Sequence, residues 1–229
     1  VAGNLVVGIS GSYDRQMALD FVEARFGHLP KVGFDTKGLP THAPRKAQSE
    51  RHEAVGEQAV VCVAYPHCGF GPDLVTSANI AEELLSGMAS GLFHRVREEK
   101  GLAYFVGATR VETVDQGMFY LYAGTTAEAA QEVLQEMESE LVRLRKGQFK
   151  PEEIEDAKRR LRVSRRQNRQ SAGARMQGAM VRELVGLGAN FDAEWDRRMA
   201  LTDEAAVQAF ARRFLDVKFE QELVVLPKA

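Results

Sequence analysis

The sequence predicts an α+β fold in which helices cover one face of a mainly antiparallel sheet. Short apolar runs bounded by glycine, proline or polar residues indicate strands at 4–11, 59–65, 103–110, 117–123 and 222–226. Most of the stretches between them repeat apolar residues at the spacing of an amphipathic helix. No long linker divides the sequence, so we expect a single domain over residues 1–229. Its abrupt start inside a predicted strand suggests a fragment of a longer chain.

The first half of the chain alternates predicted strands with helices. Asp14 is placed to cap a helix after the first strand, and Gly27 is placed to end it. Residues 30–57 hold several prolines among polar residues, which predicts a long surface connection. A buried strand over 59–65 and an interrupted helical region over 72–100 follow.

The second half begins with a predicted hairpin and continues with helices. Thr125 and Glu128 fit a capping box at the start of a helix that Gly147 would end. Pro151 is suited to the first position of the next helix, and helical periodicity continues to about residue 215. The apolar residues expected to face the sheet from the first of these helices are Ala130, Val133, Leu134, Met137, Leu141 and Leu144.

Composition excludes several classes of protein. The 229 residues are 45% hydrophobic and 27% charged, as in an ordinary globular protein, with a formal net charge of -2. That charge gives no overall attraction to nucleic acid or anionic lipid. Two cysteines are too few for a disulfide framework, and no apolar run reaches the length of a membrane span. We expect a soluble protein with no membrane span and no nucleic-acid partner. The composition does not determine the compartment, for which our expectation is the cytoplasm or periplasm of a bacterium.

The histidines and cysteines do not form a recognisable metal site. No H-x-x-E-H or H-E-x-x-H motif occurs in the sequence. His94 and Glu98 lie one helical turn apart, which is more typical of a surface pair than of metal ligands. Cys62, His67 and Cys68 are close in sequence but lack a fourth ligand. We therefore expect neither a metal site nor a catalytic residue in this chain alone.

Residues 158–175 carry eight basic side chains and no acidic one. Helical spacing places five of them on one face, namely Lys158, Arg162, Arg165, Arg166 and Arg169. The simplest interpretation is a solvated helix face. A surface that steers acidic peptide segments is the second interpretation. A nucleic-acid groove is the third, and the absence of stacking aromatic residues from the stretch weighs against it.

The most specific motif runs from residue 83 to residue 106. The pattern L-F-x-x-x-R-E-x-x-G-L-A-Y-x-V is matched by Phe93, Arg97, Glu98, Gly101, Leu102, Ala103, Tyr104 and Val106. This stretch resembles the second domain of the M16 zinc peptidases, the family of pitrilysin, insulin-degrading enzyme and the mitochondrial processing peptidases. Residues 4–30, 117–125 and 151–175 resemble further segments of that domain in the same order. Ser10-Gly11-Ser12 departs from the Gly-Asp that more often ends the first strand in the family.

The resemblance implies a non-zinc, C-terminal "inactive" domain with the fold of the LuxS/MPP-like metallohydrolases. In this family an inverted H-x-x-E-H motif and a downstream glutamate hold zinc in a different domain. The implied partners are therefore a zinc-bearing M16 domain or subunit, in a homo- or heterodimer, and a peptide substrate. Arg97 and Tyr104 have the seven-residue spacing of the family's substrate-binding pair. A guanidinium can hold a peptide carbonyl, and a phenol can donate to an oxyanion.

A catalytically inactive structural subunit, as in the core proteins of the respiratory bc1 complex, is the alternative that the resemblance leaves open. The presence of both Arg97 and Tyr104 favours the peptidase interpretation.

We expect the isolated chain to retain no stoichiometric zinc and to cleave no peptide, because its sequence lacks a tetrahedral ligand set. Metal analysis after dialysis tests this. One equivalent of retained zinc that is lost on substituting Cys62 or His67 would contradict it.

Overall fold

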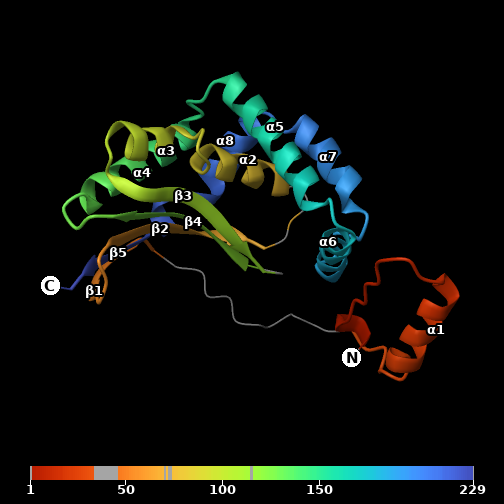
Figure 1. Cartoon of the computed structure of the whole chain (residues 1–229). Helices are drawn as coiled ribbons and strands as arrows, with labels where there is room; N and C mark the ends of the chain where they lie inside the picture. Colours follow the sequence, from red (N-terminus) through yellow and green to blue (C-terminus); the bar gives the residue numbers. More distant parts are fainter. Residues whose placement is uncertain (1, 34–45, 70, 72–73, 114–115, 229) are drawn as a thin grey trace. The chain divides into compact units, whose positions relative to one another are not determined.

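The computed structural model describes residues 2–33, 46–69, 71, 74–113 and 116–228 (Figure 1). Its contacts group the chain into two compact units. The helical unit comprises residues 1–41 and 162–197, and the sheet unit comprises residues 42–161 and 198–229. The single domain expected over the whole chain stays a prediction.

The sheet unit contains five strands in the order β1-β5-β2-β4-β3. Their bounds are β1 Gln48–Ala54, β2 Ala59–Cys68, β3 Ala103–Glu112, β4 Gln116–Thr125 and β5 Gln221–Pro227. Strands β1 and β5 are parallel, and the other three pairings are antiparallel. The predicted α+β fold with a mainly antiparallel sheet is confirmed, and the predicted strands at 59–65, 103–110, 117–123 and 222–226 are present.

Three helices cover one face of this sheet: α2 Val75–Leu85, α4 Ala130–Lys146 and α8 Glu204–Phe214 (Figure 1). Alternate residues of each central strand point toward them and are buried, as in the cross-strand pair Val63 and Leu121. The apolar residues predicted to face the sheet from α4 are all buried. The sheet unit also contains three short helical elements and parts of two longer helices. The short elements are α3 Gly91–Phe93, η2 His94–Glu99 and η3 Val217–Phe219.

Those longer helices are α5 Pro151–Asn168 and α7 Phe191–Leu201, and each contributes residues to both units. The helical unit also contains η1 Ala2–Asn4, α1 Arg15–Phe26 and α6 Ala172–Leu184. Helix α1 begins as predicted, with the Asp14 carboxylate accepting a hydrogen bond from the Met17 amide at 2.8 Å. Of the helices in the described part of the chain, none is long and apolar enough to cross a membrane.

Two predictions about strands were wrong. Residues 4–11 form no strand, and the short helix η1 takes up the first of them. A strand needs a neighbour to pair its backbone groups, and no other strand of the described residues pairs with this segment. Conversely, β1 lies within residues 30–57, predicted to be a surface connection. All seven of its residues are exposed, so it lacks the apolar alternation that identifies a strand in sequence. Residues 34–45 of that connection lie outside the described residues.

The capping box predicted at Thr125 and Glu128 was also wrong. Thr125 ends β4, and its hydroxyl donates to the Leu102 carbonyl instead of capping a helix. Helix α4 begins five residues later, and the Thr126 hydroxyl accepts from the Ala129 amide at 3.3 Å. Hydrogen bonds from its own amide and from Thr126 hold the pKa of Glu128 below its ordinary value. The motif therefore stabilises the turn before the helix.

Leu141→Ala tests the packing of α4 on the sheet. Leu141 is completely buried, so the change removes apolar contacts and leaves a cavity. We expect the free energy of unfolding to fall by about 2–5 kcal/mol in chemical denaturation. Gln135→Ala, at an exposed position of the same helix, should change it by less than about 0.5 kcal/mol. Equal losses in the two variants would show that the buried face of α4 is assigned wrongly.

Candidate functional site

The segment that carries Arg97 is a short helix of unusual geometry. Ser90 caps its start by accepting a hydrogen bond from the Phe93 amide at 3.1 Å, and the six residues of η2 are π-helical. Gly101 then adopts φ +61°, a left-handed conformation that favours glycine. The Leu102 amide donates to the Val96 carbonyl at 2.8 Å and closes the turn into β3. The helical region predicted to extend to residue 100 therefore ends at Glu99, within one residue of that prediction.

Ion pairs fix this segment to α4. Arg95 donates from Nε to Glu136 at 3.1 Å and from a terminal nitrogen to Glu140. Lys100, one residue beyond η2, donates to Glu132 at 2.8 Å and to Glu136 at 2.7 Å. Lys100 and then Arg95 bind Glu136 tightly enough to hold its pKa below the ordinary value, against the opposing effect of burial. The backbone around Arg97 is therefore attached to α4 at both ends of η2.

Glu140 is the buried member of this network, with 2% of its side chain exposed. Its two oxygens accept from Arg95 and, at 2.9 Å, from Arg143. Arg143 also reaches Glu153 of α5 at 3.1 Å, within the sheet unit. A carboxylate so deeply buried is stable only when charged partners replace its lost hydration. Glu140 therefore joins η2, α4 and the start of α5.

Arg97 remains accessible although its neighbours are paired. Its guanidinium lies 5.2 Å from the ring centroid of Phe93, a cation–π contact that orients it. Its Nε lies 3.9 Å from a Glu98 oxygen, and 48% of the side chain is exposed. Most of the hydrogen-bonding capacity of this guanidinium is thus directed toward solvent.

Tyr104 sits on a β-bulge at the start of β3. The cross-strand partners shift between Ala103, opposite Thr125, and Phe105, opposite Gly124, so Tyr104 is the extra residue. A bulge turns a side chain out of the regular alternation, and Tyr104 and Phe105 are in consequence both exposed, at 56% and 43%. The phenol is therefore available for hydrogen bonding outside the sheet.

Arg97, near the end of η2, and Tyr104, near the start of β3, flank the turn over residues 100–102. One end offers a fork of N–H donors, and the other offers a single neutral O–H donor. Both residues therefore offer exposed hydrogen-bond donors. The strand predicted from residue 103 begins at Ala103, whereas the bulge that exposes Tyr104 carried no signal in the sequence.

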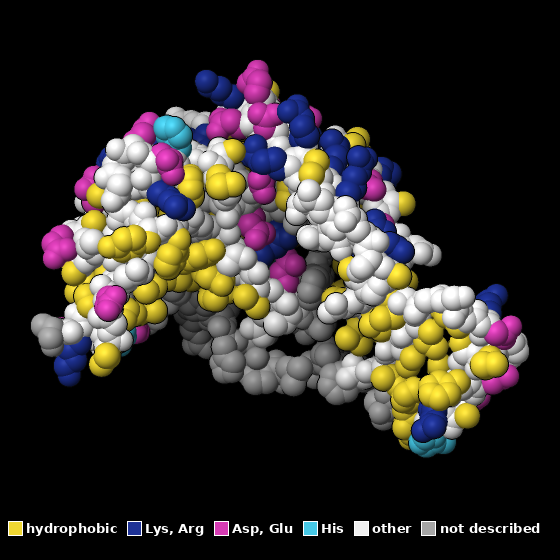
Figure 2. Space-filling model, in the orientation of Figure 1, with side chains coloured by type: hydrophobic (Ala, Val, Ile, Leu, Met, Phe, Trp, Pro, Cys, Tyr) yellow, Lys and Arg dark blue, Asp and Glu magenta, His cyan; other side chains and the backbone are white. Residues whose placement is uncertain are grey.

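The second face of the sheet is not covered by α2, α4 or α8. Cross-strand register places a series of exposed apolar side chains on it: Val60, Phe105, Val111, Met118 and Leu223. The Phe105 ring also packs against Gly124 and contacts Tyr122, with a centroid distance of 6.0 Å. Figure 2 shows hydrophobic side chains gathered along the strands of the sheet unit. An apolar surface of this extent is typical of an interaction face.

The described side chains among those considered as metal ligands make other contacts, and the side chain of Cys68 lies outside the described ones. Within the described ranges, no group of three or more His, Cys, Asp or Glu side chains is arranged to hold a metal. His94 pairs with Glu99 at 3.1 Å on the surface, rather than with Glu98. His67 is buried against the rings of Phe210 and Phe214, with Glu112 at 3.4 Å. Burial raises the pKa of the Cys62 thiol, which disfavours the thiolate needed for zinc binding.

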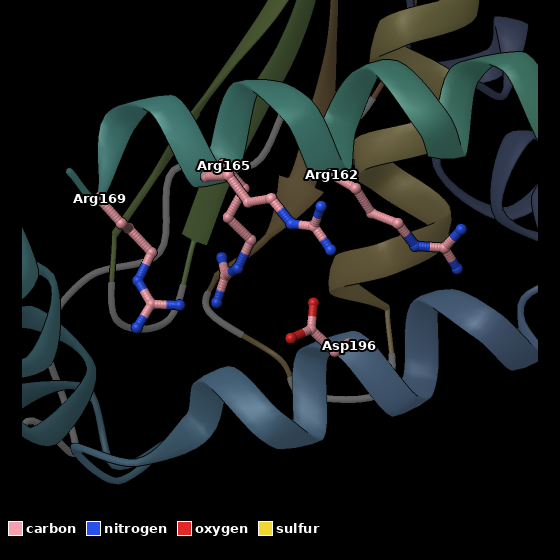
Figure 3. Close-up of a pocket in the computed structure, with 5 residues that line it drawn as sticks. Arg162, Arg165, Arg169 and Asp196 are labelled. Carbon is pink, nitrogen blue, oxygen red and sulfur yellow. The ribbon is translucent and has the colours of Figure 1, made fainter.

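The basic face predicted on the helix after Pro151 divides into two parts. Lys158, in the sheet unit, is buried and donates to Glu155 at 2.7 Å. The four arginines of the predicted face line a pocket with Asp196 of α7 in the helical unit: Arg162, Arg165, Arg166 and Arg169 (Figure 3). The predicted clustering of these four is confirmed, but they surround a hollow rather than forming an even solvated face.

Comparisons with known proteins give consistent results. The family model described as "Peptidase M16 inactive domain" matches residues 1–161. An "Uncharacterized zinc protease YmxG" of Bacillus subtilis is 28% identical over 182 residues, covering 79% of this chain and 44% of that protein. A crystal structure of a "peptidase M16 inactive domain from Pseudomonas fluorescens" has a TM-score of 0.78 and 19% identity, over 95% of this chain and 52% of that one.

A structure titled "Complex III2 from Candida albicans, Inz-5 bound" also contains a similar chain. Its TM-score is 0.78 with 14% identity, over 94% of this chain and 53% of that one. Both structural likenesses show a shared fold. The chain spans about half the length of the relatives it matches, from 44% to 53% in these three cases.

Glu140→Gln tests the buried network. The amide keeps the shape of the side chain but removes the charge that both arginines need, so hydrogen bonds to a charged group are lost. We expect the free energy of unfolding to fall by about 1–3 kcal/mol in chemical denaturation. Glu138→Gln, exposed on the same helix, should cost less than about 0.5 kcal/mol. If Glu140→Gln were equally neutral, the network would not stabilise the site.

Proposed function

Because the chain belongs to the family of peptidase M16 inactive domains, we propose that it is the substrate-binding, non-zinc half of an M16-type metallopeptidase. In this proposal it forms one wall of a peptide-cleavage chamber. A zinc-bearing domain or subunit forms the other wall, and zinc resides there. The chain covers 44% of the YmxG protein, which leaves room in that relative for a second domain.

The proposal rests mainly on one observation. Arg97 and Tyr104 are both exposed, and they flank a turn whose preceding segment is attached to α4 by ion pairs. Arg97 would donate its N–H groups to a backbone carbonyl of an extended peptide and so hold it in register. Tyr104 would donate its O–H to the oxyanion of the tetrahedral intermediate. A phenol suits this role because its neutral O–H group binds the oxyanion of the transition state more strongly than the uncharged carbonyl of the substrate.

The sheet face opposite α2, α4 and α8 supports the proposal that this chain forms a chamber wall. Its exposed apolar residues, among them Phe105, Met118 and Leu223, would lose contact with water when a partner packs nearby. Phe105 directly follows Tyr104, so the proposed substrate donor lies beside this face. The partner and the peptide would then occupy adjacent surfaces of the sheet unit.

A catalytically inactive structural subunit is the second candidate function. The likeness to a chain of the Candida albicans Complex III2 structure supports it at the level of fold. In a purely structural subunit, nothing requires Arg97 and Tyr104 to take part in peptide turnover. Kinetic measurements therefore separate the two candidates.

Tyr104→Phe and Arg97→Ala test the proposed function in a complex reconstituted with the zinc-bearing partner. Tyr104→Phe removes one oxyanion donor, so kcat should fall by roughly 10²–10³ while folding is unchanged. Arg97→Ala removes a charge-assisted contact to bound peptide, so its main effect should be a rise in KM of about tenfold.

Two control variants match these changes at exposed positions elsewhere. Tyr13→Phe, at a tyrosine that is 52% exposed, and Arg159→Ala, at an arginine that is 75% exposed, should leave both constants unchanged. Unchanged kinetics in the Tyr104 and Arg97 variants would reject the peptidase role and favour the structural subunit.

A further inference from the structure

The helical unit contains a pocket that the proposed peptide-binding turn does not use. It has a volume of about 300 Å³ and is lined by Arg162, Arg165, Arg166, Arg169 and Asp196. Figure 3 shows the labelled arginines along α5 on the side that faces Asp196 of α7. The volume lies at the lower end of the range for sites that bind small molecules or single side chains. Its lining is almost entirely cationic.

A single carboxylate beside the pocket, that of Asp192, already binds three guanidinium groups. Arg165 pairs with one of its oxygens, while Arg169 at 2.6 Å and Arg182 at 3.1 Å pair with the other. Each of these side chains is at least partly buried, with exposed fractions from 17% to 36%. Asp192 therefore holds Arg165 and Arg169 in place at the pocket.

Positive charge exceeds negative charge around this pocket. The lining contains four arginines and one acidic residue, Asp196. Two of these arginines, Arg165 and Arg169, form ion pairs with Asp192, which also pairs with Arg182. The buried Nε atoms of Arg165, Arg169 and Arg182 have no hydrogen-bond partner among the described residues. Burial, and then the repulsion of Arg182 and Arg169, lower the pKa of Arg165 despite the attraction of Asp192. An additional anion would relieve this repulsion.

We propose that the pocket binds the side-chain carboxylates of acidic segments in a polypeptide. This inference rests on the proposed function, because that function makes a peptide the expected ligand. A carboxylate entering the pocket would accept hydrogen bonds from Arg162 and Arg166, while Arg165 and Arg169 stay paired with Asp192. The pocket would thereby give the chain a preference for substrates with acidic residues.

The geometry favours a peptide carboxylate over a nucleic acid. Binding of single-stranded nucleic acid generally adds base stacking on aromatic side chains to phosphate contacts. No aromatic residue is among those that line the pocket, and the ring of Trp195, which contacts the lining Arg165 guanidinium at 4.3 Å, is only 4% exposed.

Fluorescence anisotropy with the whole 229-residue chain and a labelled pentaglutamate peptide tests the proposal. Arg162→Gln and Arg166→Gln each remove a donor from the pocket, so each should weaken binding by about five- to tenfold. Arg159→Gln makes the same change of charge on the same helix, at a side chain that is 75% exposed and paired with Asp156. It should weaken binding by less than about twofold.

Asp196→Asn provides a gain of affinity that a folding defect would not produce. It removes the acidic group from the lining, so binding of pentaglutamate should strengthen by about two- to fivefold. Pentaglutamine should not bind measurably. Equal weakening by Arg159→Gln and Arg162→Gln, no binding of pentaglutamate, or tighter binding of a five-nucleotide oligothymidylate would each overturn the proposal.

This test is independent of the peptidase assay, because it needs neither zinc nor the zinc-bearing partner. Loss of kcat in Tyr104→Phe with no binding of pentaglutamate would reject the acidic pocket and leave the proposed function standing. Binding of pentaglutamate with unchanged kinetics in Tyr104→Phe would reject the proposed function alone.

Discussion

The buried carboxylate of Glu140 is the interaction on which the geometry of the sheet unit around Arg97 depends. Removing a charge from water is costly, so Glu140 requires charged donors on both of its oxygens, and Arg95 and Arg143 provide them. Arg95 belongs to η2, so this requirement attaches η2 to α4. Helix α4 is in turn attached to the sheet through side chains such as Leu141, which are completely buried. A hydrophobic contact thus fixes the helix, and an ion pair fixes the turn upon it.

The same network explains why neighbouring basic residues differ in what they can do. Arg95 and Lys100 are held by two carboxylates each, which leaves their charges compensated within the fold. Arg97, between them, makes a ring contact and one ion pair at 3.9 Å among the residues that the structure describes. Because the flanking residues hold the backbone, Arg97 can remain exposed without the segment becoming loose. Binding of an incoming carbonyl then does not have to order this stretch of chain, a cost that commonly weakens recognition by surface loops.

Prediction from sequence succeeded where burial and periodicity determine the structure. The alternation in β2 and the helical spacing in α4 are direct consequences of facing a core, so both elements were identified. Prediction from sequence failed where pairing with a segment distant in the sequence determines the local structure. Strand β1 is polar throughout and exists through its pairing with β5, while residues 4–11 have strand composition but no described strand beside them. The bulge at Tyr104 depends on the register of β4, which no local pattern encodes. Arg97 and Tyr104 were therefore identified from a sequence motif. Their exposure is a finding of the structure.

Two kinds of recognition follow if both proposals hold. Arg97 and Tyr104 would contact the peptide backbone, which is the same in every substrate, so they would contribute binding and turnover without selecting a sequence. The arginine pocket would contact side chains and would therefore distinguish acidic peptides from neutral ones. The two features belong to different compact units of the chain. Substitutions in the helical unit, such as the exchange of Arg166 for a neutral residue, could then alter selectivity while the core of the sheet unit and the turn anchored by Glu140 stay intact.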